Sequence, residues 1–406
     1  MLSFFHTRFS PLKSRLFATL FVSQFFSNTG SWAFEIARTW IIVDRLGKGH
    51  EVGAVMLAGG VSALIFTLYG GFLVDRFSFR QVLWASIFAK CLLFLLSIWL
   101  FFIVEYRSIA LWHLVVFSFI QGVIVAFDAP AFFSFSMKLV PSTDLQQAIA
   151  LNSMNFQASR TVGPLLAGVL MGIGGPGLVI LFDGLSFLGP AFATSLVLKE
   201  KKLQDMYLGT NTSSRGFRIL FKDAKVMAPL LQLFFCLSFF LPTLLVTFRI
   251  YIKDTFQVTP EQFSYIFMGP ALGSLVGAMT FALIKPKMPI KWLRLGIPLF
   301  ILSTTIIPAY HDLRLTIFNM TIAGFAAFFS FSALTVHMQL YIQEGFRGRL
   351  TSMILVGFSV VVPMGAYPIG KLIDHYSAGF CLIAVPCFFL IFSMPLWFIN
   401  ISRSTT

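Results

Sequence analysis

The chain has 406 residues, of which 57% are hydrophobic and only 11% are charged, and its formal net charge is +14. A soluble domain carries about 25% charged residues, so this sequence excludes an ordinary water-facing surface and indicates a protein embedded in a lipid bilayer. The 30 Lys and Arg residues lie mostly between apolar runs rather than on one polar face, which argues against a nucleic-acid partner.

Apolar runs long enough to cross the hydrocarbon, about 20 residues each, predict an all-α integral membrane fold with twelve transmembrane helices. They form two sets of six, at 16–43, 52–74, 81–104, 110–136, 145–172, 176–198, 228–251, 261–284, 292–310, 314–340, 349–371 and 378–400. We therefore expect an N-terminal half (1–198), a polar central loop (199–227) and a C-terminal half (228–406). The first run exceeds a signal-peptide core of about 7–15 residues, so it is expected to remain as a span.

Basic residues predict the orientation of these spans. The loops on the side of both termini hold 20 Lys and Arg residues, seven of them in the central loop, against six on the opposite side. The positive-inside rule then places both termini in the cytoplasm and the protein in the cell inner (cytoplasmic) membrane.

Enzymatic chemistry finds no support in the sequence. The four cysteines lie inside apolar segments without metal-ligand spacing, and there is no Gly-x-x-x-x-Gly-Lys phosphate loop. No nucleophile stands beside a plausible base. The sequence predicts neither an enzyme nor a bound metal or cofactor, and His337 is interpreted as a packed or interfacial residue rather than a ligand.

Small residues mark one expected helix contact. Gly269, Gly273 and Gly277 recur every four residues in the run 261–284, which places them on one helix face where another helix can approach closely.

Five short motifs in the N-terminal half resemble one known family. They are Gly71-x-Leu73-x-Asp75-Arg76-x-x-x-Arg80, Asn28-Thr29-Gly30-Ser31-Trp32, Asp128-Ala129-Pro130-Ala131 with the residues that follow to Asn152, Ser159-Arg160-Thr161-Val162-Gly163-Pro164 with its continuation to Gly168, and Asp183-Gly184-Leu185-Ser186-Phe187-Leu188. Together they resemble the major facilitator superfamily of transporters, in the branch that includes enterobactin exporters and macrolide efflux pumps. The second half resembles the family only in its apolar pattern and glycines.

The resemblance implies roles for several residues. Asp75, with Gly71, Arg76 and Arg80, is expected to latch the two halves together in the outward-facing state, and Gly163-Pro164 resembles the bend of the antiporter signature. The alternatives are a water-screened loop carboxylate and a tolerated kink.

The chain also departs from the family pattern. The loop carries Ser78-Phe79 in place of Gly-Arg or Gly-Lys, and its counterpart at 284–291 lacks an Asp-Arg pair. Ser118 stands where many proton antiporters carry an arginine, so any proton relay must be sought elsewhere.

Ionisable residues inside a bilayer are costly and are functional candidates by default. Here they are Glu35, Arg38, Lys90, Asp128 and Arg160. Glu35 and Arg38 lie three residues apart on one helix face and are expected to pair. The bland alternatives are mutual neutralisation for this pair, snorkelling of Lys90 toward the interface, and a structural bridge between Asp128 and Arg160.

The sequence thus predicts a secondary active exporter of a siderophore-like metabolite or amphipathic drug, working by alternating access with protons as the expected coupling ion. We expect a monomer whose partners are a small-molecule substrate and the lipid bilayer. An importer or lipid flippase of the same fold remains open, and so does a non-transporting membrane scaffold or sensor.

Overall fold

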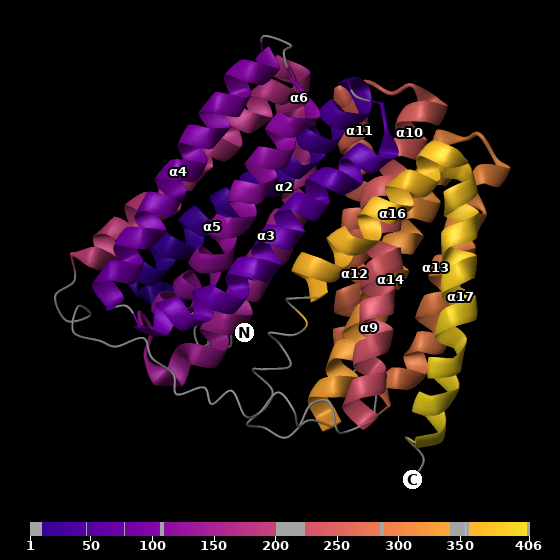
Figure 1. The fold of residues 1–406 in the computed structure, drawn as a ribbon. Coiled ribbons are helices and arrows are strands. Elements are labelled where there is room, and N and C mark those ends of the chain that lie inside the picture. Colours follow the sequence, from indigo (N-terminus) through magenta and orange to yellow (C-terminus); the bar gives the residue numbers. More distant parts are fainter. Residues whose placement is uncertain are drawn as a thin grey trace. The chain divides into compact units, whose positions relative to one another are not determined.

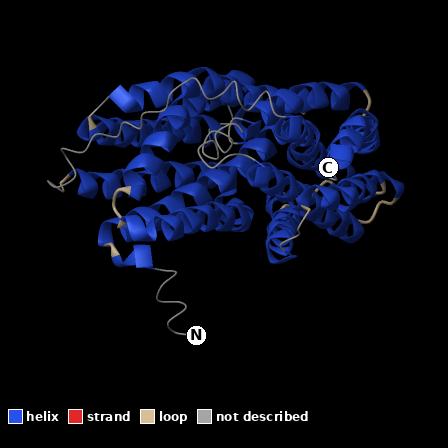
Figure 2. Ribbon diagram, turned by 90° about the horizontal axis from the view of Figure 1, so that it is seen from below, coloured by secondary structure: helices blue, strands red, loops and turns tan. Residues whose placement is uncertain are grey.

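The structure is a computed structural model that describes residues 10–45, 47–76, 78–105, 109–199, 224–284, 288–341, 354 and 357–403. Helices make up nearly all of these segments, the loops between them are short, and the described part of the chain contains no strand (Figure 2). A helix is suited to lipid because its backbone amide and carbonyl groups form hydrogen bonds within the helix itself.

Contacts between residues divide the chain into two compact units. Unit 1 comprises residues 1–41 and 61–211, and unit 2 comprises 42–60 and 212–406. The helices α2 (Arg15–Arg45) and α3 (Gly49–Arg76) each contribute to both units. The domain boundaries expected from the sequence stay a prediction.

Unit 1 is built from parts of α2 and α3 with α4 (Phe79–Glu105), α5 (Leu111–Met137) and α6 (Leu145–Leu198) (Figure 1). One apolar cluster joins Leu20 of α2 to Val82 of α4 and Val197 of α6. A second joins Leu93 of α4 to Ile124 of α5 and Phe187 of α6. These contacts fix the mutual positions of the helices that carry the buried charges described below.

The long helix α6 is broken at two glycines. Gly174 has φ −143° and ψ 20°, and Gly175 has φ 71°, in the region that glycine adopts without steric cost. Pro176 then starts the second segment, where its fixed φ suits a first helical position. The segments 145–173 and 176–198 correspond to two separate predicted spans.

Unit 2 contains α9 (Ala224–Pro242), α10 (Phe248–Phe256), α11 (Pro260–Ile266), α12 (Met268–Ile284), α13 (Leu293–Thr305), α14 (Leu313–Tyr341), α16 (Val362–His375) and α17 (Ala378–Arg403). Single π-helical turns, Thr243–Thr247 and Gly357–Val361, lead into α10 and α16.

The predicted glycine face of α12 is confirmed as a close helix contact. A Cβ added to Gly273 would lie 2.0 Å from the carbonyl oxygen of Thr321, and one added to Gly277 would lie 2.3 Å from that of Phe325, both in α14. Only glycine lets the two backbones approach this closely.

Eight of the described helical segments are long and apolar enough to cross a membrane. They are Gly49–Phe66, Arg80–Val104, Leu111–Asp128, Gln147–Leu198, Pro229–Phe256, Pro260–Ile284, Pro289–Ala309 and Leu313–Leu340. The helix α2 is not among them, although it has 31 residues. Its polar side chains lower its hydropathy, and the same side chains build the candidate site.

Candidate functional site

A row of polar side chains follows one face of α2. Gln24, Asn28, Ser31, Glu35 and Arg38 are spaced by three or four residues, which places them on one side of the helix. We call this row the polar face of α2. Its partners come from α5 and α6, so it points into unit 1.

The first part of this face is an amide network. Gln24 Nε2 donates to Asn28 Oδ1 at 2.9 Å, and Asn28 Nδ2 donates to Asn155 Oδ1 of α6 at 3.3 Å. Asn155 in turn donates to the carbonyl oxygen of Phe21 at 2.7 Å. Neutral amides of this kind hold two helices in register without a charge in the bilayer.

At the other end of the face, Glu35 and Arg38 form the predicted ion pair. Arg38 Nη1 also donates to Ser118 Oγ of α5 at 2.9 Å. By the family resemblance, Ser118 occupies the position at which many proton antiporters carry an arginine. The cationic group at this place is therefore supplied by α2 instead of α5.

Lys90 and Asp128 form a second buried ion pair, between α4 and α5. Lys90 Nζ lies 2.5 Å from Asp128 Oδ1 and 2.6 Å from Ser86 Oγ, and Ser86 also donates to the carboxylate. The Lys90 side chain is only 4% exposed, so it does not snorkel toward the interface. The alternative bridge between Asp128 and Arg160 is also wrong, because Asp128 faces α4.

Arg160 lies instead against α2. Its guanidinium carbon is 5.4 Å from the ring centroid of Trp32, a cation–π arrangement that suits a planar, weakly hydrated cation. Trp32 packs edge to face on Phe156, 5.8 Å away, which holds the indole in place.

Gly163 and Pro164 lie in a continuous part of α6, and the functional bend expected there stays a prediction. The backbone of α6 keeps helical angles through both residues and departs from them at Gly174 and Gly175. Gly163 has a packing role, because a Cβ at this position would lie 2.5 Å from Cβ of Trp32. Its small size brings α6 onto the part of α2 that Arg160 contacts.

Asp183 is a buried carboxylate that the sequence interpretation did not single out as an ionisable candidate. It is 0% exposed, and Ser31 Oγ donates to its Oδ1 at 3.1 Å. Its second oxygen, Oδ2, has no hydrogen-bond partner among the residues that the structure describes. The signal was available in the sequence, since Asp183 lies in the middle of the predicted span 176–198.

The expected latch is only partly visible. Gly71, Asp75 and Arg76 lie in the helical backbone of α3, but their side chains are outside the described residues. Arg80 is exposed in the first turn of α4. The role of these four residues stays a prediction. His337, in α14, is buried, in line with its interpretation as a packed residue.

Unit 2 contains a separate group of ionisable residues and one glycine, which we call the Asp374 cluster (Asp44, Gly49, His50, Lys253 and Asp374). The Asp374 carboxylate accepts from the backbone N–H of Gly49 at 2.5 Å and of His50 at 3.1 Å. It also lies 2.5 Å from His50 Nδ1. A side chain of α16 thereby caps the first turn of α3, where the helix dipole favours a negative charge.

The rest of the cluster holds the neighbouring segments together. Lys253 Nζ of α10 lies 2.5 Å from Asp44 Oδ1 near the end of α2. Glycines allow close backbone contact beside it, because a Cβ on Gly370 would lie 2.4 Å from the carbonyl oxygen of Gly49. A cavity of about 540 Å³, lined by Lys48, Asp254, Lys371 and His375 among others, adjoins the cluster. Sequence reasoning missed this group because its members are far apart in the chain.

The model of one protein family, described as transmembrane secretion effector, matches residues 6–405. The chain belongs to this family of major facilitator superfamily transporters. The predicted resemblance is confirmed, and members of the family are transporters rather than enzymes. The chain is thus a multi-pass membrane transporter, which implies a small-molecule substrate.

Two curated relatives cover most of the chain. The staphyloferrin A transporter of Staphylococcus aureus (strain NCTC 8325 / PS 47) is 19% identical over 368 residues, 88% of this chain and 88% of that protein. Macrolide efflux protein A of Streptococcus pyogenes is 22% identical over 359 residues, 86% of this chain and 87% of that protein.

Solved structures agree on the fold. A bacterial homologue of the human lysosomal transporter Spinster, in an inward-facing and occupied conformation, matches with a TM-score of 0.72 at 14% identity, covering 97% of both chains. A bacterial homologue of the iron transporter ferroportin, in an inward-facing state, matches with a TM-score of 0.70 at 15% identity, covering 94% of this chain and 98% of the other. At these identities the likeness shows the fold alone.

Proposed function

We propose that this family member is a secondary active exporter that moves a siderophore-like metabolite or an amphipathic drug out of the cell, with proton antiport as its energy source. It would work in the cell inner membrane as a monomer of twelve spans, with both termini cytoplasmic and the halves 1–198 and 228–406 joined by the loop 199–227. The relatives that transport staphyloferrin A or export macrolides support this substrate class.

The observation that carries the proposal is the set of ionisable residues held inside unit 1. Glu35 pairs with Arg38 and Lys90 with Asp128, while the carboxylate of Asp183 accepts a hydrogen bond from the Ser31 hydroxyl group. A membrane scaffold has no need of such groups, because each charge costs roughly 2.5–3.5 kcal/mol to insert at the centre of a span. A transporter uses them to exchange partners between cargo, protons and protein.

Proton coupling, in this proposal, centres on Asp183 and not on Glu35 or Asp128. Both of those carboxylates already have a cationic partner, so taking up a proton would leave a buried cation uncompensated. Asp183 forms no ion pair with a described residue, so its protonation breaks none of the ion pairs named above. The Ser31 hydroxyl accepts or donates as the carboxyl requires, so the contact survives both states.

The Asp374 cluster serves as a gate in this proposal. By the orientation proposed here it lies at the extracellular ends of α2, α3, α10 and α16. Within unit 2 it joins residues 42–45 of α2 and the first turn of α3 to α10 and α16 through a helix cap, ion pairs and close glycine contacts. Opening a path on this side would separate Asp374 from the first turn of α3, and Asp75 would act at the cytoplasmic side.

A deletion strain tests substrate class and direction together. Media from the deletion strain and its parent would be compared for small molecules, with and without iron limitation. The proposal predicts that at least one metabolite falls in the medium and rises in the cells of the deletion strain, with the larger effect under iron limitation. Unchanged media in both conditions would instead favour an importer or a lipid flippase.

A further inference from the structure

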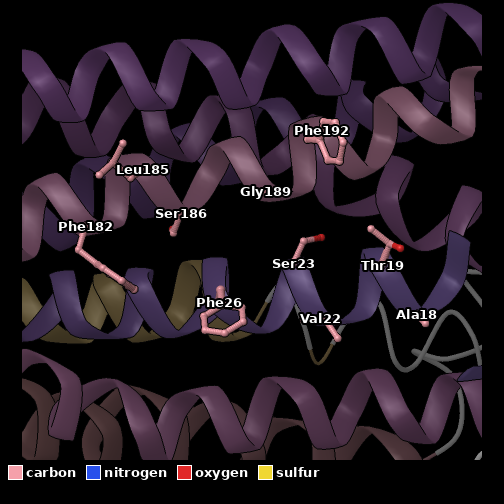
Figure 3. Close-up of a pocket in the computed structure, with 10 residues that line it drawn as sticks. All are labelled: Ala18, Thr19, Val22, Ser23, Phe26, Phe182, Leu185, Ser186, Gly189 and Phe192. Atoms are coloured by element: carbon pink, nitrogen blue, oxygen red, sulfur yellow. The ribbon is translucent and has the colours of Figure 1, made fainter. Parts of the chain in front are cut away.

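A groove with a volume of about 760 Å³ runs between α2 and the second segment of α6, inside unit 1 (Figure 3). The two helices are antiparallel here, so Thr19 and Phe192 lie at one end and Phe26 lies toward the other. Its aromatic walls face outward, with Phe26 55% and Phe192 63% exposed. In a membrane protein such a surface faces hydrocarbon.

The floor of the groove is made of small residues whose polar atoms are already bonded. Gly189 leaves space beside Ser23, and the Ser23 hydroxyl donates to the carbonyl oxygen of Leu20 at 3.0 Å. Ser186 donates to the carbonyl oxygen of Asp183 at 2.7 Å, and Thr19 to that of Arg15 at 2.8 Å. With these hydroxyl groups bonded to carbonyl oxygens of their own helices, the described residues of the groove form an apolar slot that offers no free donor to a polar ligand.

The length of the slot matches one leaflet of a bilayer. Phe182 and Phe192 are ten residues apart, about 15 Å along a helix, and the hydrocarbon core of a bilayer is about 30 Å thick. A linear chain lying in the slot would therefore run from the end of the helices to about the middle of the membrane.

Two cations stand at the open end. Arg15 begins α2 one helical turn before Thr19, and Lys199 follows α6 two turns after Phe192. These spacings place both residues on the helix faces that form the groove. Both side chains are exposed, where a lipid head group would meet them.

We propose that this groove binds one acyl chain of an anionic phospholipid, whose phosphate group contacts Arg15 and Lys199. The apolar slot supplies the affinity for the chain, and the two cations supply the preference for negative charge. Since the Asp183 carbonyl belongs to the groove floor and its carboxyl meets the polar face of α2, a bound lipid would press on the segment that carries Asp183. The proposal does not depend on the direction or cargo of transport.

Native mass spectrometry of the full-length purified protein tests this. The protein would be incubated with phosphatidylglycerol or phosphatidylcholine of identical acyl chains. We expect one tightly retained phosphatidylglycerol, bound at least tenfold more tightly than phosphatidylcholine. Gly189→Leu, which fills the slot, should lose this lipid, and the double variant Arg15→Gln/Lys199→Gln should bind both lipids alike.

Matched variants in unit 2 control for general effects. Ala282→Leu adds a leucine to an exposed position of α12, and Lys291→Gln/Arg294→Gln removes two exposed cations near the start of α13. Both should keep the preference of the unsubstituted protein. Equal binding of the two lipids by the unsubstituted protein would overturn the proposal. Unchanged phosphatidylglycerol binding in the groove variants would also overturn it. Displacement of the lipid by the transported compound, at the concentration that half-saturates transport, would overturn it as well, because the groove would then be a cargo site.

Discussion

Lys90 and Asp128 show how unit 1 keeps charges in a membrane. Each ion alone would carry a large desolvation cost, and the pair, completed by Ser86, leaves neither group without a partner. The pair also joins α4 to α5, so it fixes helix positions as well as charge. Substitution of one or both residues measures how much the pair contributes to stability.

Removing one partner of this pair should cost more than removing both. Lys90→Met leaves a buried carboxylate with one hydroxyl, and we expect a loss of about 3–5 kcal/mol in the free energy of unfolding. Lys90→Met/Asp128→Asn should recover most of that loss. Thermal unfolding of purified Lys90→Met, Asp128→Asn and the double variant measures this double-mutant cycle. A double variant as unstable as the less stable of the two single variants would contradict the pairing.

Substitution of Asp183 is expected to change transport and not stability. Asp183→Asn keeps a side-chain acceptor for Ser31 and introduces no charge, so the variant should fold and reach the membrane in normal amounts. Because asparagine cannot carry the proton, we expect at least a tenfold loss of pH-driven transport while exchange of labelled for unlabelled cargo continues. Glu35→Gln is the comparison, since Glu35 is held by Arg38.

If Glu35→Gln alone abolishes the pH-driven component and Asp183→Asn retains it, the proton site is Glu35, one of the five ionisable candidates in the sequence. Parallel measurements of exchange separate this outcome from simple loss of the cargo site.

At the level of whole elements, the glycines of α12 determine how closely it packs on α14. Gly273→Ala places a methyl group where the carbonyl oxygen of Thr321 lies only 2.0 Å away, so the helices must part. We expect a loss of about 1–3 kcal/mol, the usual cost of overpacking, measured by thermal unfolding. Gly379→Ala in α17 is the control, because its nearest atoms are 3.7 Å or more away, and it should be neutral or slightly stabilising.

Much of the element structure follows from sequence, and the exceptions have physical causes. Gly174-Gly175-Pro176 marks the break within α6 because glycine and proline act through their own backbones. The Glu35–Arg38 pair was predictable because both residues lie on one helix. Lys90–Asp128 and the Asp374 cluster were not, since their partners meet only after helices pack, and periodicity does not specify which helices become neighbours.

Across the molecule, α2 and α3 contribute to both units, and the parts of these helices that belong to unit 2 carry Asp44, Gly49 and His50 of the Asp374 cluster. In the proposed transport cycle, the contacts of the Asp374 cluster break when the transporter opens on the extracellular side. A variant that weakens the cluster should therefore increase the fraction of open molecules.

Asp374→Ala removes the cap of α3 and the contact with His50, an effect of about 1–2 kcal/mol, or roughly a five- to thirtyfold change in population. The reporter is Ile373→Cys, in a cysteine-free background, because Ile373 is buried and lines the adjoining cavity. We expect faster labelling by a membrane-impermeant maleimide.

Asp312→Ala provides the matched control. Asp312 caps its own helix, α14, by accepting from the N–H of Leu315 at 2.9 Å, and it is not part of the described ion pairs of the cluster. Equal labelling rates in the two alanine variants would show that the cluster is a local cap and not a gate.

The most direct test of the central claim is uptake into inverted membrane vesicles of the compound that the deletion strain fails to release. In these vesicles the extracellular side of the membrane faces the lumen, so an exporter moves its cargo into the vesicle. An imposed proton gradient, acid inside, drives accumulation of the cargo by proton antiport. We predict accumulation that depends on this protein and collapses when nigericin removes the pH gradient. No uptake, or uptake that follows the membrane potential and ignores the pH gradient, would contradict the account of a proton-coupled exporter.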